Sequence, residues 1–207
     1  TPIIGCNLLD GITSENSAHP DIRFVSVNAH ADIPAAAHNF GICVNKTTKY
    51  INFMYKGFNS YVEDSIKKNW DKMSLSDYKG VTYQYKDIAR KIEKIHILLE
   101  SAGIKKGDKV AICGKNTSHW AVTFFATLSY GAIAVPILHE FKADNIHNIV
   151  NHSEAKLLCV GDMVWENLND EMMPDLTGII LLNDFSVLKS KSEKLIALVI
   201  SLALSGR

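Results

Sequence analysis

One loop of this sequence has residue types that could hold a phosphate group. Gly114, Lys115, Asn116 and Thr117 follow a short apolar segment and lead into a segment with helical character. A Walker loop also requires a glycine five residues before its Gly-Lys pair, and that position is occupied by Lys109. Exposed N–H groups at the start of a helix can bind an anion without this pattern. We favour a capped turn between a strand and a helix over an anion site.

The histidines form no recognisable metal-binding or catalytic pattern. His147 and His152 are five residues apart, which places them about 140° apart around a helix, so they cannot share a metal. His119 and His139 have no evident nucleophile beside them, and a Gly-x-Ser-x-Gly elbow is absent from the sequence. We expect structural or loop roles for these residues and for His96.

The remaining candidate ligands are scattered along the chain. His30 and His38 are eight residues apart, and neither they nor Cys43 have the spacing of a metal site. No pair of carboxylates stands out as an acid–base site. We therefore assign no catalytic, cofactor-binding or metal-binding residue from the sequence.

The cysteines favour a reducing compartment. Cys6, Cys43, Cys113 and Cys159 lie far apart, with no Cys-x-x-Cys pair and no histidine at zinc-finger spacing. Two of them, Cys113 and Cys159, fall in segments expected to be buried strands, where a thiol behaves as a small apolar side chain. No secretory signal opens the sequence, which begins at Thr1. A cytoplasmic location is the simplest expectation.

The composition argues against nucleic acid as a partner. Lys plus Arg and Asp plus Glu both number 22, so no net charge attracts nucleic acid or an anionic membrane. With 207 residues, 47% of them hydrophobic, the chain can form one ordinary domain with a buried core and part of a second domain.

The segment from Val81 to Val160 predicts an α/β fold. Short apolar or alternating segments take turns with longer segments of helical period, a pattern typical of a parallel sheet with crossover helices. The predicted strands are residues 81–85, 109–113, 132–137, 156–160 and 178–182. One predicted helix begins after Asp87, and two more cover residues 118–130 and 144–153.

Details within these elements give further expectations. Asp87 can cap the first helix, whose apolar stripe consists of Ile88, Ile92, Ile95, Leu99 and Ala102 and which stops at Gly103. The helix at 118–130 is apolar nearly all round, which indicates that several of its sides are covered. Pro136 indicates that the strand ladder stops or reaches an edge there.

Composition divides the chain into three parts. Residues 1–53 show little sustained period, apart from a strand-like piece at 22–27, and form an irregular lead-in. Aromatic and charged residues become dense after Met54, and residues 61–70 predict an amphipathic helix with Val62, Ile66 and Trp70 one turn apart. We expect an α/β domain over 54–190.

The last part, residues 191–207, is an apolar tail. Residues 195–204 contain one polar residue, Ser201, and are too short to span a bilayer, which requires about 20 residues. The tail is expected to form a buried helix or a strand pair. A foreign origin for it also stays open.

Four segments, taken in order, resemble the AMP-forming acyl-CoA synthetases of the adenylate-forming superfamily. Residues 82–87 are similar to the first core motif, and residues 103–110 match its continuation Gly-x-x-x-Gly-Asp-x-Val. Asn116, Trp120 and residues 130–136 are similar to the second core motif, Ala-Gly-Ala-x-x-Val-Pro, and residues 153–156 resemble the next element. The resemblance covers residues 54–184, and bacterial long-chain fatty acid CoA ligases are the most similar branch.

The resemblance implies the first subdomain of the adenylate-forming fold and a two-step reaction. A fatty-acid carboxylate attacks the α-phosphate of ATP to give an acyl-adenylate and pyrophosphate, and CoA then displaces AMP. The family requires Mg²⁺ and cationic groups around the phosphates. These come from a Ser/Thr/Gly-rich phosphate loop, a Thr-Glu pair, a Thr-Gly-Asp motif and a lysine of a C-terminal domain.

None of these four features is present in the sequence. We therefore expect an inactive fragment that binds no ATP, Mg²⁺ or CoA tightly and that can self-associate through apolar surface. The alternative is a free-standing α/β module that binds a nucleotide or a protein without catalysis. A third hypothesis is that the apolar tail attaches the protein to a membrane. In that case the protein would associate with the membrane surface peripherally at most.

Overall fold

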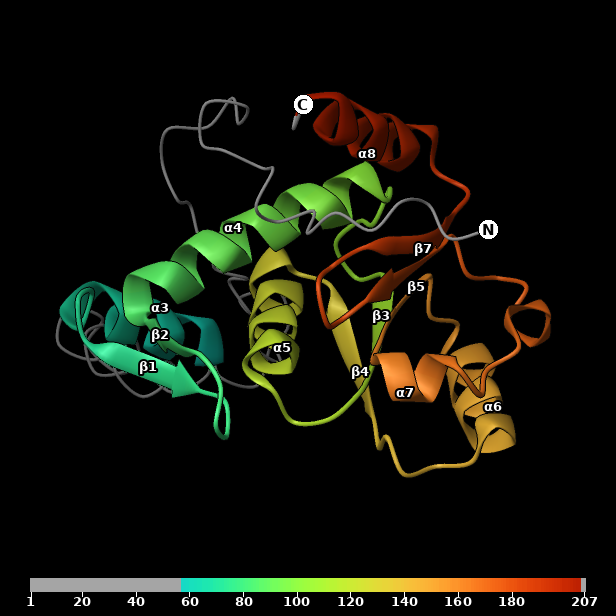
Figure 1. Cartoon of the computed structure of the whole chain (residues 1–207), viewed down its shortest axis with the longest axis horizontal. Coiled ribbons are helices and arrows are strands. Elements are labelled where there is room, and N and C mark those ends of the chain that lie inside the picture. The colour runs from blue at the N-terminus through green and yellow to red at the C-terminus, as the bar shows by residue number, and fades with distance from the viewer. Residues whose placement is uncertain (1–56, 206–207) are drawn as a thin grey trace, which may run out of the picture.

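Five strands form the central sheet in the order β4-β3-β5-β6-β7, in a computed structural model that describes residues 57–205 (Figure 1). They are β3 (Lys109–Cys113), β4 (Ile133–Ile137), β5 (Leu157–Val160), β6 (Gly178–Leu181) and β7 (Val187–Ser190). The first four pair in parallel, and β7 joins β6 antiparallel. The predicted α/β class with crossover helices is confirmed.

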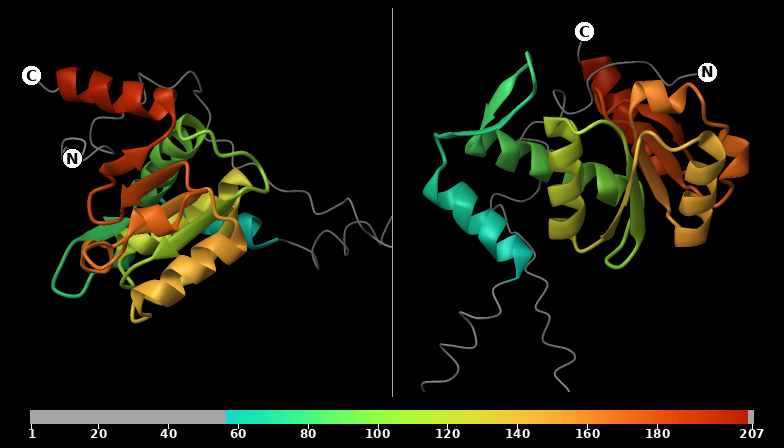
Figure 2. Two further views of the ribbon diagram at one scale, coloured as in Figure 1. Left: turned by 90° about the vertical axis from the view of Figure 1, so that its right-hand side faces the viewer. Right: turned by 90° about the horizontal axis from the view of Figure 1, so that it is seen from below.

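Helices cover both faces of this sheet (Figure 2). One face packs against α4 (Tyr85–Ser101), α5 (Ser118–Tyr130) and α8 (Glu193–Ser205). The other packs against α6 (Ala143–Ser153), followed by the short α7 (Asp162–Trp165) and the 3₁₀ turn η3 (Asp170–Met172). Alternate residues of β3 point to the two cores, with Val110 and Ile112 on one side and Ala111 and Cys113 on the other.

Helix α4 follows its predicted pattern. All five stripe residues, Ile88, Ile92, Ile95, Leu99 and Ala102, are buried. Asp87 accepts the backbone N–H of Gln84 at 3.0 Å and so completes a capping box. Gly103 follows the helix with φ of 79°, the left-handed conformation that favours glycine at a helix end.

Helix α5 has the predicted bounds, but its most buried face differs from a simple apolar stripe. Val122, Thr123, Ala126 and Thr127 are fully buried, whereas the aromatic residues lie at intermediate exposure, with Phe124 and Phe125 against Phe58 of α3 (Phe58–Lys68). Thr127 Oγ1 donates to the carbonyl of Thr123 at 2.8 Å, so its hydroxyl is satisfied within the helix. Small side chains on this face allow α4 and the sheet to approach closely.

The first predicted strand does not join the parallel sheet, which corrects the sequence analysis. Residues Thr82–Gln84 form β2, which pairs antiparallel with β1 (Met73–Ser76) in a separate two-stranded sheet. The turn between them is closed by hydrogen bonds from Asp77 N to Val81 O and from Gly80 N to Asp77 O, both at 3.0 Å. A tight turn suffices for an antiparallel pair, whereas a parallel pair requires a crossover.

Strand β7 was not predicted from the sequence. A tight turn after β6 reverses the chain, with Phe185 at φ of 59° and Leu181 N bonded to Ser186 O at 2.9 Å. At the opposite side, β4 is the edge strand that Pro136 indicated. The other predicted strands and helices of residues 109–182 agree with the observed bounds to within one residue.

The two ends of the described segment are helical. The predicted helix at 61–70 is observed as α3, with Ile66 buried, but Trp70 lies beyond the helix and is exposed. The tail forms the buried helix rather than the strand pair, because Leu195 and Val199 of α8 pack into the core. Across residues 57–205, no helix combines the length and apolarity needed to cross a bilayer. The expectations for residues 1–53 and for the start of the α/β domain at residue 54 lie outside the described residues.

Candidate functional site

The candidate site is the edge of the sheet where the parallel strands end in their carboxyl termini. From β3 the chain crosses to β4 on one side, and from β5 it continues to β6 on the other. Ligands of open α/β sheets bind in the crevice that such diverging connections leave. Here the two connections are the loop Gly114–Thr117, singled out from the sequence, and Gly161 with Asp162.

Backbone packing brings these two loops into close contact. Gly161 N donates to Cys113 O at 2.9 Å, and a Cβ on Gly161 would lie 3.5 Å from Gly114 Cα. A Cβ on Gly114 would come within 2.7 Å of Leu182 Cδ1. The two glycines therefore permit close contact between the loops.

The N-terminus of α5 is occupied by groups of the protein itself. Thr117 Oγ1 accepts the N–H of Trp120 at 3.2 Å, and Asp77 accepts the N–H of Ser118 at 2.7 Å as well as the Ser118 hydroxyl. The predicted capped turn is confirmed. A soluble anion would have to displace Asp77, a residue of the β1–β2 turn whose role the sequence pattern did not indicate.

His119 connects α5 to the loop that follows β6 through hydrogen bonds. Its Nδ1 lies 3.0 Å from both Leu182 O and Asn183 O, so this nitrogen carries the proton and donates. Burial lowers the pKa of His119, and the nearby charge of Lys91 lowers it further. The imidazole therefore has the structural role expected from the sequence.

The other histidines do not converge. His96 Nε2 lies 3.0 Å from Ala126 O and 2.9 Å from Ser129 Oγ, within the α4–α5 interface. His147 is buried and accepts the N–H of Asn169 at 3.2 Å, whereas His152 is exposed. His139 pairs with Glu140 at 3.3 Å. In the described segment, no group of three or more His, Cys, Asp or Glu side chains could hold a metal ion.

The two described cysteines are poor nucleophiles. Burial, with a smaller contribution from the charge of Glu140, raises the pKa of Cys113 to about 11. Burial alone raises the pKa of Cys159 to about 12. Since thiolates are the reactive form, both side chains act as small apolar groups near neutral pH, as predicted.

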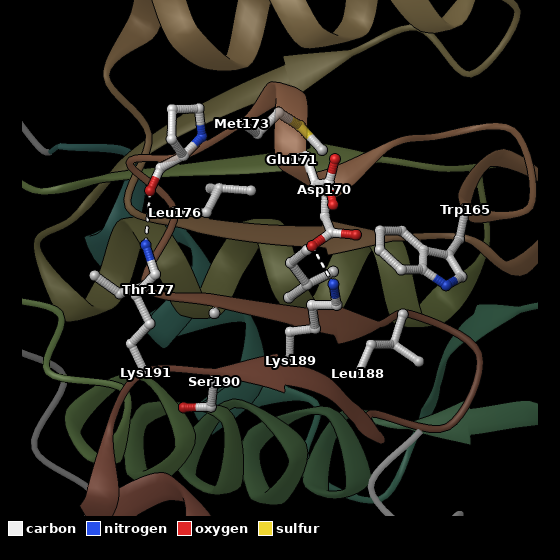
Figure 3. Close-up of a pocket in the computed structure, with 13 residues that line it drawn as sticks. Trp165, Asp170, Glu171, Met173, Leu176, Thr177, Leu188, Lys189, Ser190 and Lys191 are labelled. Carbon is white, nitrogen blue, oxygen red and sulfur yellow. Dashed lines mark hydrogen bonds and ion pairs between the residues drawn. The ribbon is translucent and has the colours of Figure 1, made fainter. Parts of the chain in front are cut away.

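Two cavities are found among the described residues. One, of about 460 Å³, is lined by residues of the β4–α6 loop and α7, including Phe141, Lys142 and Met163. The other, of about 780 Å³, lies between β6–β7 and the segment from Trp165 to Thr177 (Figure 3). We call the second one the β7 cavity. Apart from Gly178 and Ile179, which belong to the predicted strand 178–182, its residues come from segments without a clear period, so no sequence signal indicated a cavity here.

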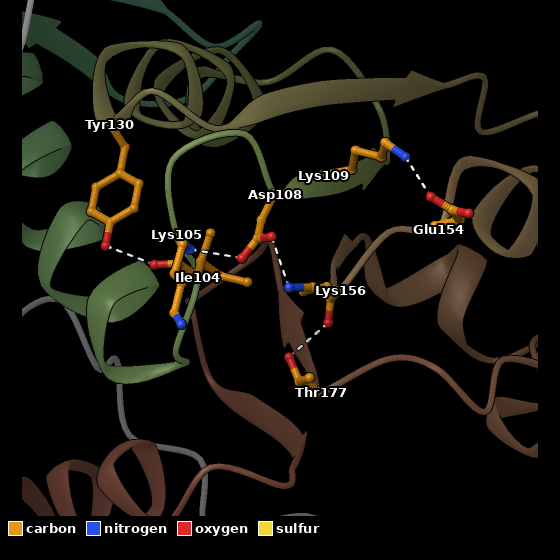
Figure 4. A network of polar contacts seen from close by, with 8 residues as sticks. All are labelled: Ile104, Lys105, Asp108, Lys109, Tyr130, Glu154, Lys156 and Thr177. Carbon is orange, nitrogen blue, oxygen red and sulfur yellow. Dashed lines mark hydrogen bonds and ion pairs between the residues drawn. The ribbon is translucent and has the colours of Figure 1, made fainter.

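Three of the segments that resemble family motifs, residues 103–110, 130–136 and 153–156, meet at the opposite, amino-terminal edge of the sheet (Figure 4). Gly107 N donates to Gly131 O at 2.8 Å, and Tyr130 Oη donates to Ile104 O at 2.9 Å. Gly107 and Gly131 have φ of 84° and 88°, which explains the glycines of both motifs. The segments 103–110 and 130–136 thus dock on each other through their backbones.

Asp108 connects this pair to the third segment, residues 153–156. Its carboxylate lies 2.7 Å from Lys156 Nζ and accepts the N–H of Lys105 at 2.8 Å. Glu154 pairs with Lys109 at 2.8 Å. Hydrogen bonds from Lys105 and Lys156, together with their charges, outweigh the effect of partial burial and lower the pKa of Asp108. These motif residues therefore stabilise the scaffold.

The fold and these motifs define the first α/β subdomain of an adenylate-forming enzyme. The sequence profile of the family described as AMP-binding enzyme matches residues 62–197. The chain belongs to this family.

Individual relatives include enzymes that act on fatty acids. Fatty acyl-CoA synthetase A of Dictyostelium discoideum is 31% identical over 102 residues, which cover 49% of this chain and 14% of that protein. Fatty acid–[acyl-carrier-protein] ligase ScoC of Streptomyces coeruleorubidus is 30% identical over 83 residues, covering 40% and 16%. Long-chain-fatty-acid–CoA ligase FadD15 of Mycobacterium bovis is 33% identical over 72 residues, covering 35% and 12%. The chain thus spans less than a fifth of each relative.

Solved structures show the same fold. The N-terminal domain of FACL13 from Mycobacterium tuberculosis matches with a TM-score of 0.56 and 19% identity, covering 70% of this chain and 36% of that chain. A long-chain-fatty-acid-CoA ligase from Archaeoglobus fulgidus matches with a TM-score of 0.56 and 20% identity, covering 69% and 29%. The likeness to these structures establishes the fold of the sheet and of the helices that cover it.

Proposed function

We propose that this chain is the first subdomain of an AMP-forming ligase that activates a fatty acid with ATP and transfers the acyl group to CoA. The observation that carries the proposal is the polar network at the amino-terminal edge of the sheet. Three family-like segments, in the family's order, build that network together. The names of the relatives support a fatty acid as the acid substrate.

The boundaries of the subdomain belong to the same proposal. We infer that residues 54–190 form it, that residues 1–53 are an irregular lead-in, and that residues 191–207 are an apolar tail that can be foreign to the parent enzyme. We also place the protein in the cytosol, because Cys113 and Cys159 are free thiols.

The described residues do not fit an ATP–Mg²⁺ site. The helix start that could bind a phosphate is occupied by Asp77, and the sequence lacks the phosphate loop, the Thr-Glu pair and the Thr-Gly-Asp motif. We therefore assign ATP, Mg²⁺ and CoA to the parent protein and derive no catalytic step from this chain. The chain by itself is expected to be inactive.

Fatty-acid-dependent exchange between ATP and radioactive pyrophosphate tests this proposal. The purified 207-residue chain should give the same signal as a sample without protein, across fatty acids of several chain lengths and with Mg²⁺ present. A full-length family ligase in the same assay serves as the positive control. Exchange that depends on both the chain and the fatty acid would contradict the claim that the missing loop is required.

Exposed apolar side chains provide an experiment that distinguishes the fragment hypothesis from the free-standing binding module. Tyr78, Met73, Leu138 and Met163 are 90%, 67%, 61% and 59% exposed. A fragment that lacks its neighbouring subdomain should bind a hydrophobic dye and form dimers or larger species on a sizing column. A monomer without dye binding that retains a nucleotide through purification would favour the module instead.

A further inference from the structure

The β7 cavity combines an apolar floor with lysine side chains along one wall. Leu176, Ile179 and Leu188 form the floor, and Trp165 stands at one end (Figure 3). Its volume of about 780 Å³ falls within the range of about 300–1,000 Å³ that is typical of small-molecule sites. The cavity exists because the segment between α7 and β6 covers this part of the sheet only with short turns.

Two lysines, one in β7 and one just after it, reach across the cavity to the opposite wall. Lys189 forms an ion pair with Asp170 of η3, so its charge is already neutralised. Lys191 Nζ instead donates to the backbone carbonyl of Pro174 at 2.6 Å. Within the described residues, no carboxylate forms an ion pair with Lys191.

Lys191 is therefore the cationic group available to a ligand. An ammonium has three N–H donors, and the Pro174 carbonyl uses one of them. The carboxylates of the cavity, Asp170 and Glu171, are drawn near Lys189 and Trp165 rather than beside Lys191 (Figure 3). A ligand with a single negative charge fits this end better than a phosphate dianion does. The Lys191 ammonium carries one positive charge, which can neutralise a monoanion but only half of the charge of a dianion.

We propose that the β7 cavity binds an amphipathic monocarboxylate. The carboxylate accepts hydrogen bonds from the Lys191 ammonium, and the apolar body lies over Leu176, Ile179 and Leu188 toward Trp165. This inference goes beyond the proposed function and does not depend on it, because binding here requires neither ATP nor CoA.

Decanoate, kept below its micellar range, is a direct probe of this site. Trp165 is one of three tryptophans in the chain, and it lines the cavity. Decanoate should change the tryptophan emission of the 207-residue chain saturably, with calorimetry giving the same dissociation constant. Decyltrimethylammonium, which has an equally long tail and the opposite charge, should bind at least about tenfold more weakly.

Three variants locate the binding. Lys191→Gln should weaken decanoate binding about tenfold, the size of a lost charge-assisted hydrogen bond. Lys106→Gln, which changes an exposed lysine in the turn before β3, should leave the affinity unchanged. Trp165→Phe should remove the emission change while calorimetry still detects binding, because the ring forms only one end of the cavity.

Several results would overturn the inference. These are no saturable binding to the unaltered chain, equal binding of the cationic amphiphile, equal effects of the two lysine variants, or an emission change that persists in Trp165→Phe. The comparison of decanoate with the cation needs no variant, so it decides the matter even if a substitution prevents folding. Failure here would leave the pyrophosphate-exchange result, and hence the proposed function, unaffected.

Discussion

At the scale of single residues, Asp108 connects three segments that are distant in the sequence. Its side chain is 16% exposed and contacts both Lys156 and the backbone of Lys105. Partial burial by itself would raise the pKa of Asp108, but the hydrogen bonds and charges of Lys156 and Lys105 lower it overall. A carboxylate with a lowered pKa in the folded state stabilises the fold above its unfolded pKa, and this contribution is lost as the pH falls through the folded-state pKa.

The first prediction concerns Asp108→Asn. At pH 7 the substitution should reduce the free energy of unfolding by about 1–2 kcal/mol, because it removes a charge-assisted pair while keeping the shape. The gap between the unaltered chain and the variant should begin to narrow at about pH 4, where the carboxyl of the unfolded chain becomes protonated, and should close as the pH falls through the lower pKa of the folded state. Urea denaturation at several pH values measures both effects.

Asp71→Asn is the matched control for this prediction. Asp71 also pairs with a lysine, Lys86 at 3.0 Å, but its side chain is 77% exposed. Loss of such a surface pair should cost less than about 1 kcal/mol. Equal losses at positions 71 and 108, or a gap at position 108 that is independent of pH, would show that Asp108 does not connect the segments as described.

At the scale of elements, the β1–β2 hairpin holds the start of α5. Asp77 in the hairpin turn accepts two hydrogen bonds from Ser118, the first residue of the helix. Asp77→Ala should therefore cost about 1–3 kcal/mol, since a helix N-terminus loses its carboxylate and the Ser118 N–H loses its partner. Hydrogen exchange should become faster in the β1–β2 amides as well as in the first turn of α5.

Ser76→Ala provides the comparison for Asp77. The Ser76 hydroxyl bonds only to Thr82 Oγ1 at 2.8 Å, in an exposed position. This change should alter the stability by less than about 0.5 kcal/mol and leave exchange in α5 unchanged. If both substitutions had equally small effects, the hairpin would be an independent element rather than part of the α5 cap.

Local pattern explains which elements could be predicted from the sequence. The stripe of α4 and the apolar strand β3 depend on side chains a few positions apart, so periodicity located them. The partner of Ser118 is 41 residues away, and His119 contacts carbonyls 63 and 64 residues away. Such contacts leave no local signal, which is why the occupied helix start and the contacts of His119 could be found only in the structure.

The antiparallel pairings were missed for a related reason. β1 and β7 are four residues each, with mixed exposure, and neither shows strict alternation. Their turns place Lys79 and Phe185 at positive φ, residues that do not mark a turn as glycine does. The β7 cavity depends on one of these strands, so it could not be predicted either.

At the scale of the whole molecule, the packing of α8 determines where the folded unit ends along the chain. Leu195 is fully buried and Val199 is 2% exposed, within the same core as α4. Leu195→Ala should reduce the free energy of unfolding by about 2–5 kcal/mol, as for other buried leucines. Ile200→Ala, at a side chain that is 52% exposed, should cost much less. Thermal and urea unfolding measure the difference.

Equal, small effects at positions 195 and 200 would mean that α8 is detached from the core in solution. Deletion of residues 191–207 would then leave the stability unchanged. A large difference instead makes α8 part of the folded unit, whatever the origin of the tail sequence.

The most direct test of the central claim is the DNA sequence of the gene through and beyond the codon for Arg207, translated in all three frames from Lys194 onward. We expect a Ser/Thr/Gly-rich phosphate loop in one of these frames, since residues 54–190 are proposed as the first subdomain of a longer ligase. An in-frame stop codon with no such loop in any frame would contradict this proposal, and the free-standing binding module would then take its place.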